Sequence, residues 1–534
     1  MRRRFLEAPL WPGLVGGLAA AAISLLLQSE RDTVILPEIT TDAATSIFGA
    51  RGFSFLLGEL GSDGKPLLFL GVLIVQVAVY ASLWMNATPP LRRWWGERRR
   101  EAGIAVDAVA LILASASIFL VASAILIAAT DAELPSRTSW GAYTLSLLAA
   151  SAAFALVTAV LAALAPQPSD ARPSDVQPAQ PQPLDVPADP SRRRFLRSAG
   201  GLAVGAVATV FIGNQVVGRR GSGVQRSNTG MPTPEITPTD DFYIVSKNLF
   251  DPSVNGKRWR LRVGGAAQGR LELALADLPR IPAGEEFVTM QCISNRVGGD
   301  LIGNALWKGF PLRTLLEQVE PLPSANFVAF RSVDDYTESL PLDFALQDQV
   351  MLVYEMNGEP LPFKHGFPLR LLAPGKYGIK HPKWLTEIAL VEEEFFGFWQ
   401  QRGWSQEARM KTSSRIDVPA PGQTVDEGSL RIYGVAFSGD RGIQRVEVST
   451  DRGFTWNEAV LRLPLAPLTW VVWHYDTTVV SDNGRFNVMA RATDGTGEVQ
   501  AFKPTRPDPD GAAGWPAVSV RVREGPVPID EASG

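Results

Sequence analysis

The sequence predicts three kinds of structure in succession: an α-helical membrane anchor, an α+β domain and a C-terminal β-sandwich of the immunoglobulin type. Two observations carry this prediction. Long apolar runs fill the first 165 residues, and short alternating runs bounded by glycine and proline dominate from about residue 235. A chain of 534 residues also has room for three or four folding units at roughly 150 residues each.

The predicted anchor rests on five apolar segments. A spanning helix needs about 20 mostly apolar residues, and four such runs within 165 residues argue against the alternative of buried core helices. We therefore expect a four-helix transmembrane region over 1–165 and a fifth spanning helix within 191–218. The segments are Trp11–Leu27, Leu67–Met85, Ile104–Ala129, Ala142–Ala165 and, diluted by glycines, Ala199–Val217.

Basic residues predict how the anchor is oriented. Arginines cluster at 2–4, between 92 and 100, and at 192–197, and the positive-inside rule puts these segments in the cytoplasm. Five crossings then place everything after about residue 218 on the extracytoplasmic side. Within the apolar runs only Asp107 is charged at neutral pH, which argues against a pump or transporter. No histidine occurs before residue 365, which excludes a haem held by two histidines in the membrane half.

Residues 166–190 form a proline-rich linker, and an arginine motif follows it directly. The linker has no aromatic residue and no apolar period, so we expect it to be extended. The sequence SRRRFLR over 191–197 resembles a twin-arginine export signal, which is read by a route that moves domains already folded. A basic stop-transfer cluster is the alternative interpretation.

The exported half is predicted to hold two domains. Residues 259–263 alternate as a strand does, and 314–319 predict a short helix after Pro311, so 235–410 is expected to be an α+β domain. Residues 412–524 are expected to be all β and to form the immunoglobulin-like sandwich. Alternating runs there cover 429–435, 444–449, 469–474 and 485–492.

The composition excludes several kinds of site and partner. A single cysteine excludes intrachain disulfides, cysteine-based zinc fingers and cysteine-ligated iron–sulfur clusters. The net charge of −4 argues against a nucleic-acid partner. Cys292 follows an apolar strand and leads into a glycine-rich loop, where Arg296 would favour the thiolate. It is therefore a candidate metal ligand, a candidate nucleophile with His365 or His381 as base, or a small buried apolar residue.

A second cluster lies between residues 365 and 385. It holds two of the three histidines and several cations, including Arg370 and Lys383. A solvated basic loop is one interpretation, but apolar residues such as Leu369 and Trp384 alternate with the cations, so part of the cluster must be buried. Buried cations need a counter-anion, and a phosphate-bearing ligand would supply one.

Three stretches together resemble the sulfite oxidase family of molybdenum enzymes over roughly 235–524. The residues Gln291–Cys292 and Asn295–Arg296, followed by IGNALWKG at 302–309, resemble the cysteine region of that family. The stretch YEMNG at 354–358 with HGFPLRLLAPGKYGIKHPKWL at 365–385 resembles its pterin-binding segment. Residues 434–439 and 446–456 resemble its C-terminal dimerisation domain.

The resemblance implies an α+β domain of the sulfite-oxidase type and a site for a single molybdopterin with molybdenum. Cys292 would be the protein ligand of the metal, and Arg296 and Trp404 would occupy catalytic positions. The reaction would be a two-electron oxygen-atom transfer without haem or iron–sulfur cluster. The implied pterin contacts are His365, Arg370, His381, Pro382 and Lys383, with Asp240, Tyr243, Ile244 and Ser332 from the preceding segments.

Departures from the family pattern concern the substrate. Val297 replaces a second arginine, Ser246 and Lys247 stand where a pocket arginine is expected, and Trp404 stands where a tyrosine is expected. Fewer cations and an added indole suit a less charged or larger substrate than sulfite, so sulfoxide-type reduction fits at least as well as sulfite-like oxidation. The cytochrome domain of animal sulfite oxidases is absent, which implies a separate electron-transfer protein, either a cytochrome or a quinone-linked subunit.

A non-catalytic binding or scaffold protein that keeps the fold is the alternative to an enzyme. A cysteine hydrolase is a further one. The dimerisation-domain resemblance implies a homodimer in either case. Cys292 distinguishes the molybdenum enzyme from the scaffold protein, because a scaffold has no need of a thiolate at the start of the glycine-rich loop.

Overall fold

The computed structural model of the chain describes residues 15–21, 147–148, 150–155, 157, 233–248, 251–252 and 254–523. The described parts of 15–21 and 147–157 are helical and lie within two of the apolar runs. The rest of the predicted anchor, the linker and the export motif lie outside the described residues. Within the described ranges, no helix is long and apolar enough to cross a membrane. Residues 233–523 belong to one compact unit.

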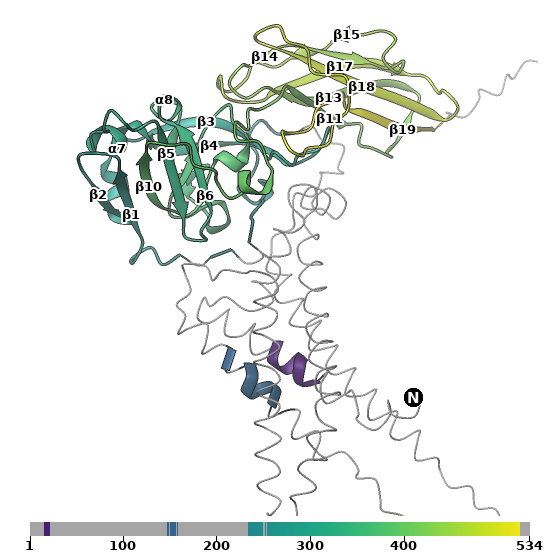
Figure 1. Cartoon of the computed structure of the whole chain (residues 1–534). Helices are drawn as coiled ribbons and strands as arrows, with labels where there is room; N and C mark the ends of the chain where they lie inside the picture. The colour runs from purple at the N-terminus through teal and green to yellow at the C-terminus, as the bar shows by residue number, and fades with distance from the viewer. Residues whose placement is uncertain are drawn as a thin grey trace, which may run out of the picture. The chain divides into compact units, whose positions relative to one another are not determined.

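One mixed sheet forms the outer part of the α+β domain, with strand order β2-β1-β10-β5-β6 (Figure 1). β1 and β10 pair in parallel, whereas the other neighbours are antiparallel. The predicted strand at 259–263 is confirmed as β1. The strands are β1 (Arg260–Gly265), β2 (Leu271–Ala274), β5 (Phe327–Ser332), β6 (Thr337–Pro341) and β10 (Leu385–Val391).

A second, antiparallel sheet carries the site-bearing strand β3. Its order is β3-β4-β7-β8, and β9 also pairs with β7. β3 and β4 pair over their length from Gly284 opposite Gly309 to Gln291 opposite Ile302, so Cys292 stands just past the end of a regular ladder. The strands are β3 (Gly284–Gln291), β4 (Ile302–Pro311), β7 (Met351–Met356), β8 (Glu359–Pro360) and β9 (Arg370–Leu372).

Short helices join the strands. α7 (Arg313–Gln318) begins just after Pro311 and buries Leu315 and Leu316 against the domain's main core, which confirms the helix predicted at 314–319. Such a short helix depends on this packing, because isolated helices of this length are unstable in water. The remaining helices are α8 (Leu342–Ala345) and the 3-10 turns η3 (Thr239–Asp241), η4 (Leu275–Arg280), η5 (Phe363–His365), η6 (Gly378–Lys380) and η7 (Gln400–Arg402).

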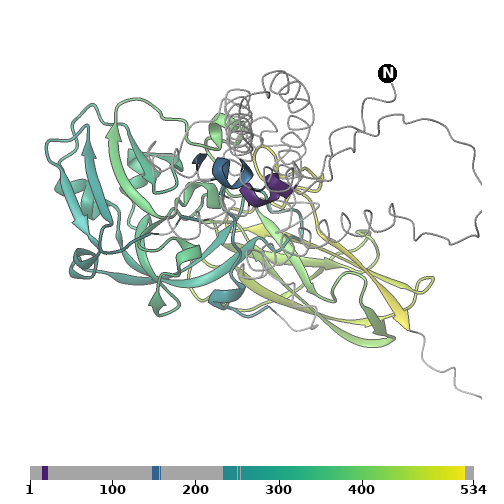
Figure 2. The same cartoon turned by 90° about the horizontal axis from the view of Figure 1, so that it is seen from below.

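The C-terminal domain consists of two sheets around one core, drawn in green to yellow (Figure 2). Ile432 and Trp473 reach this core from one sheet, and Val446, Val488 and Val520 from the other. The alternating runs 429–435, 444–449, 469–474 and 485–492 fall on β13, β14, β17 and β18, so the predicted strands are confirmed. One sheet is β11 (Ser413–Val418), β13 (Gly428–Phe437), β17 (Val471–Val479) and β16 (Val460–Leu461); the other is β12 (Thr424–Asp426), β19 (Ala517–Arg523), β18 (Arg485–Asp494), β14 (Ile443–Ser449) and β15 (Asn457–Glu458).

The outer edge of β3 is covered by the C-terminal domain. Thr289 donates its backbone N–H to Leu468 O at 3.0 Å, and Trp470 donates its backbone N–H to Thr289 Oγ1 at 2.9 Å. The Ser413 hydroxyl donates to Gln291 Oε1 at 3.2 Å. An uncovered edge strand exposes unpaired N–H and C=O groups. These bonds pair one backbone N–H of the edge and tie two β3 side chains to the C-terminal domain, which helps to fix the strand that leads to Cys292.

Candidate functional site

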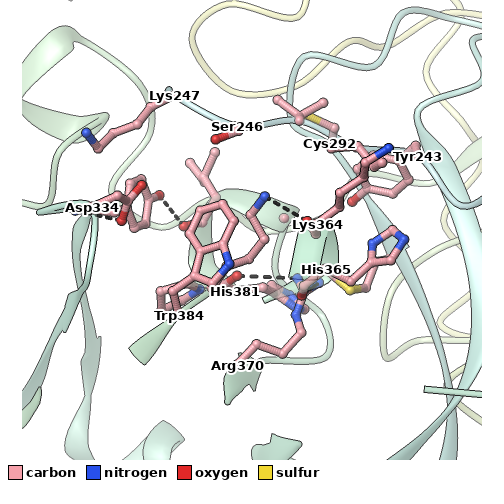
Figure 3. Close-up of a pocket in the computed structure, with 18 of the residues that line it drawn as sticks. Tyr243, Ser246, Lys247, Cys292, Asp334, Lys364, His365, Arg370, His381 and Trp384 are labelled. Carbon is pink, nitrogen blue, oxygen red and sulfur yellow. Dashed lines mark hydrogen bonds between the residues drawn. The ribbon is translucent and has the colours of Figure 1, made fainter. Parts of the chain in front are cut away.

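Cys292 lies at a tight turn after β3. Its N–H donates to Leu301 O at 2.9 Å, and its C=O accepts from the N–H of Asn295 at 3.0 Å. The sulfur lies 2.9 Å from Ser294 Oγ and belongs to a side chain that is 5% exposed. The turn therefore holds the thiol in one place, at the wall of a cavity (Figure 3).

The cavity has an empty volume of about 700 Å³, part of which opens to solvent. Segments far apart in the sequence form its wall: the stretch after η3, the end of β3, the β5–β6 turn, and the loops around η5 and η6. Its lining side chains are Phe242, Tyr243, Ile244, Val245, Ser246, Lys247, Met290, Cys292, Asp334, Tyr336, Lys364, His365, Arg370, Gly378, Ile379, His381, Pro382, Lys383, Trp384 and Trp399.

The lining has an excess of positive charge. Four lining residues are lysine or arginine, whereas Asp334 is the one carboxylate in the lining. Both carboxylate oxygens of Asp334 already accept hydrogen bonds: Oδ2 from Asn248 Nδ2 at 2.7 Å, and Oδ1 from the backbone N–H of Tyr336 at 3.2 Å. A wall with this charge favours an anionic ligand.

Arg370 organises the floor of the cavity. One Nη atom donates to His365 O at 2.9 Å and the other to His381 O at 3.4 Å, so the guanidinium links the two histidine segments. It also lies 5.2 Å from the Trp307 ring centre. Burial lowers the pKa of Arg370 to about 10, which leaves the side chain charged at neutral pH. Its Nε atom is buried and has no hydrogen-bond partner among the described residues.

Lys383 contributes a second cation beside Arg370. Its Nζ donates to Lys364 O at 3.1 Å and lies 4.1 Å from the Trp384 ring centre. Burial lowers the pKa of Lys383, and the neighbouring Arg370 acts in the same direction while Asp251 opposes it. An anion bound in the cavity would relieve this cost, because it would supply the missing countercharge.

The two histidines are held neutral by their surroundings. Burial, followed by the charge of Arg370, lowers the pKa of both His365 and His381 to about 3. His365 Nε2 lies 3.2 Å from Thr239 O. His381 uses both ring nitrogens, with Nε2 at 3.1 Å from Lys376 O and Nδ1 accepting from Ala373 N at 3.4 Å. His381 therefore has no free ring nitrogen with which to activate Cys292 as a hydrolase would require.

Tyr243 brings an uncommitted hydroxyl to the cavity. Within the described part of the chain its buried OH has no hydrogen-bond partner. Burial, followed by the nearby Cys292, raises the pKa of Tyr243 far above its usual value, so the phenol keeps its proton. Gly378 faces the same point: a β-carbon there would lie 3.0 Å from Tyr243 Oη and 3.7 Å from Cys292 Cα.

These features fit a phosphate-bearing cofactor. The cavity offers surplus cations, buried donors without described partners, and the sulfur of Cys292 as a soft thiolate ligand. The described residues contain no group of three or more His, Cys, Asp or Glu side chains that could hold a metal ion.

Most of the predicted site residues come together in this cavity, and four do not. Asp240 is exposed on η3, and Ser332 is 1% exposed with a hydroxyl that lacks a partner among the residues described. Arg296 lines a different cavity, which Val297 also lines. Trp404 is 4% exposed and packs in an apolar cluster with Trp399. Those that line the main cavity are Tyr243, Ile244, Cys292, His365, Arg370, His381, Pro382 and Lys383.

Several lining residues were not predicted from the sequence as site residues. Lys364 directly precedes His365, and its place beside the motif could have indicated it. Asp334 and Tyr336 come from the β5–β6 turn, and Trp399 from a loop near η7, and no local pattern marks them. Lys247 occupies a position interpreted as a loss of charge, yet it does line the cavity.

Comparison with known sequence families defines the class of protein. Residues 249–399 match the family described as "Oxidoreductase molybdopterin binding domain", and residues 405–507 match the "Mo-co oxidoreductase dimerisation domain". The cavity with Cys292 lies largely within the first match. The chain thus contains an oxidoreductase molybdopterin-binding domain followed by a Mo-co oxidoreductase dimerisation domain.

Curated relatives give the particular family. The chain is 33% identical to sulfite oxidase of Gallus gallus over 313 residues, which covers 50% of this chain and 68% of that protein. It is 32% identical to sulfite oxidase of Arabidopsis thaliana over 274 residues, covering 42% and 70%. Mitochondrial sulfite oxidase of Mus musculus is 33% identical over 329 residues, covering 52% of this chain, which spans only 60% of that relative's length. The chain belongs to the sulfite oxidase family.

Proposed function

We propose that this protein is a membrane-anchored, extracytoplasmic molybdopterin oxidoreductase that carries out two-electron oxygen-atom transfer. The observation that carries the proposal is the position of Cys292, a buried thiol at the wall of a cavity lined by four cations and one committed carboxylate. A molybdenum–molybdopterin cofactor needs a soft ligand for the metal and positive charge for its phosphate. This cavity provides both.

Cys292 would bind the metal, and the cofactor would supply the two-electron chemistry. Arg370 and Lys383 would hold the phosphate end, because both are positively charged and face the same cavity. Tyr243 would donate its free hydroxyl to a bound group. His365 and His381 would pack against the pterin as neutral rings, with Ile244 and Pro382 as apolar contacts. Asp240 and Ser332 lie outside this lining and would act on the cofactor indirectly.

The mouth of the cavity supports a substrate of low charge. Lys247 donates to Asn248 Oδ1 at 3.1 Å, and Asn248 in turn donates to Asp334, so a cation and a carboxylate lie in one network there. Arg296 and Val297 line the other cavity. We propose a small uncharged substrate, as in sulfoxide-type reduction, with sulfite-like oxidation as the second reaction to test because the relatives are named sulfite oxidases.

The proposal extends to the parts of the chain that precede residue 233. Five apolar segments would anchor the protein, and the motif at 191–197 would direct the folded enzyme across the membrane. A separate cytochrome or quinone-linked subunit would exchange electrons with the site. The dimerisation-domain match supports a homodimer.

The test is the metal content of the purified full chain. We expect about one molybdenum per chain in the wild type and its loss in Cys292→Ser. Lys308→Gln is the matched control, since Lys308 pairs with Glu355 at 3.0 Å away from the cavity, and it should keep the metal. Turnover of sulfoxides with a reduced dye, compared with sulfite and an oxidised dye, then identifies the substrate. A folded wild type without molybdenum would overturn the proposal and favour the scaffold alternative.

A further inference from the structure

The hydroxyl of Ser294 lies against the sulfur of Cys292. The Oγ–Sγ distance is 2.9 Å, and the two side chains are 4% and 5% exposed. Neither the sequence pattern nor the family resemblance gives Ser294 a role. Water has little access to a contact that is buried on both sides, so the hydrogen bond acts at close to its full strength.

The backbone of the turn holds this contact in place. Asn295 donates its N–H to Cys292 O at 3.0 Å, and Asn295 Oδ1 accepts from Leu301 N at 3.0 Å. Cys292 N–H donates to Leu301 O at 2.9 Å. Ser294 therefore lies on a turn that is tied at both ends to residue 301, and its hydroxyl has a fixed approach to the sulfur.

The direction of the hydrogen bond follows from the protonation of the sulfur. With a free thiol, either atom can donate. A metal-bound thiolate carries no proton, so Ser294 O–H must then be the donor. We infer that Ser294 is a positioning residue that donates a hydrogen bond to the Cys292 thiolate and thereby raises the reduction potential of the bound metal. This inference rests on the proposed function.

The electron density on the sulfur decides whether the hydrogen bond raises or lowers the reduction potential. A donated hydrogen bond draws density away from the thiolate, so the sulfur gives less to the metal. The oxidised metal depends more on that donation than the reduced metal does, and hydrogen bonds to ligand sulfurs are known to set potentials in this way. Removing the hydroxyl should therefore favour the oxidised state and lower the midpoint potential.

The experiment compares the metal-loaded full chain in three variants. Ser294→Ala removes the hydroxyl, and Ser294→Thr keeps it. Ser413→Ala removes a hydroxyl that bonds to Gln291, next to Cys292, without contact to the sulfur. Molybdenum per chain and the midpoint potential of the one-electron couple are measured for each. We expect Ser294→Ala to shift the oxidised-to-reduced ratio about tenfold, a fall of about 59 mV, while Ser294→Thr and Ser413→Ala stay near the wild type.

Each outcome decides the matter. A lowered potential in Ser294→Ala alone supports the inference, whereas loss of molybdenum from that variant overturns it, because the hydroxyl would then retain the metal rather than set its potential. An unchanged potential in a loaded Ser294→Ala protein overturns it, and so does an equal change or an equal metal loss in Ser294→Thr. A wild type that holds no molybdenum refutes the proposed function instead, so the two failures are distinct.

Discussion

A buried ion pair between β6 and η6 should contribute strongly to the stability of the α+β domain. Glu338 on β6 is 0% exposed at its side chain, and Lys380, the last residue of η6, is 3% exposed. Lys380 Nζ lies 2.6 Å from Glu338 Oε1 and also donates to Ser339 O at 3.1 Å. Gln400 Nε2 donates to the other carboxylate oxygen at 3.0 Å. Burial raises the pKa of Glu338, and the charge of Lys380 opposes that shift.

Lys380→Met removes one partner and leaves the carboxylate buried without its countercharge. Breaking a buried pair in this way costs about 3–5 kcal/mol. In a domain of 150–250 residues, each kcal/mol lowers the unfolding midpoint by about 2–4 °C, so we expect a fall of about 6–20 °C. The assay is thermal unfolding of the full chain in detergent, followed by tryptophan fluorescence.

Two further variants make this prediction specific. Arg431→Met breaks the pair with Asp476, whose side chains are 52% and 60% exposed, and should leave the midpoint nearly unchanged because solvent screens such pairs. The double variant Lys380→Met, Glu338→Leu removes the stranded carboxylate and should recover part of the loss. The reasoning is refuted if Lys380→Met lowers the midpoint no more than Arg431→Met does.

Three other predictions concern the cavity. Burial lowers the pKa of His365 to about 3, so below pH 6.5 the unfolded chain binds a proton that the folded chain does not. The free energy of unfolding should therefore fall as the pH drops from 6.5 towards 3, by about 2–3 kcal/mol at pH 4.5. Unfolding midpoints measured across this range should fall less steeply in His365→Gln. Gly378→Ala would press a methyl group against Tyr243 Oη and should lower the molybdenum bound per chain. The control Gly284→Ala, whose new β-carbon meets nothing within 4 Å, should keep its molybdenum. Equal metal content in the two variants would contradict the close approach of residue 378 to Tyr243. Arg370→Lys removes the guanidinium whose two Nη atoms donate to the carbonyls of His365 and His381. It should weaken cofactor retention by about 10–100-fold, measured as the molybdenum left after dialysis. Full retention would show that the guanidinium is dispensable.

Local signals were enough to predict much of the fold. β18 alternates between buried and more exposed positions along most of its length, and this period of two is visible in the sequence without any partner strand. α7 follows a proline, which is a local start signal. The position of Cys292 after a strand was likewise readable, because apolar β-forming residues precede it and a glycine-rich loop follows.

The members of the site could be predicted only where they share a motif. His365, Arg370 and His381 lie within one stretch and enter the cavity together. Asp334 enters through a turn about 40 residues from Cys292, and such an approach depends on tertiary packing. Trp404 matches a family position, but in this fold its ring fills an apolar cluster and Trp399 lines the cavity. Position in a motif does not determine which of two neighbouring rings faces a cavity.

The hydrogen bond between Trp470 and Thr289 also sets an order for biosynthesis. Its two residues are 181 positions apart in the chain. At about 5–20 residues per second, a ribosome needs roughly 10–35 s after making Thr289 before Trp470 exists to cover that strand edge. During this interval the segment leading to Cys292 has an open edge that can pair with other nascent chains. The strand that leads to Cys292 therefore gains this cover only after translation has passed Trp470, later than the last residue that lines the cavity, Trp399.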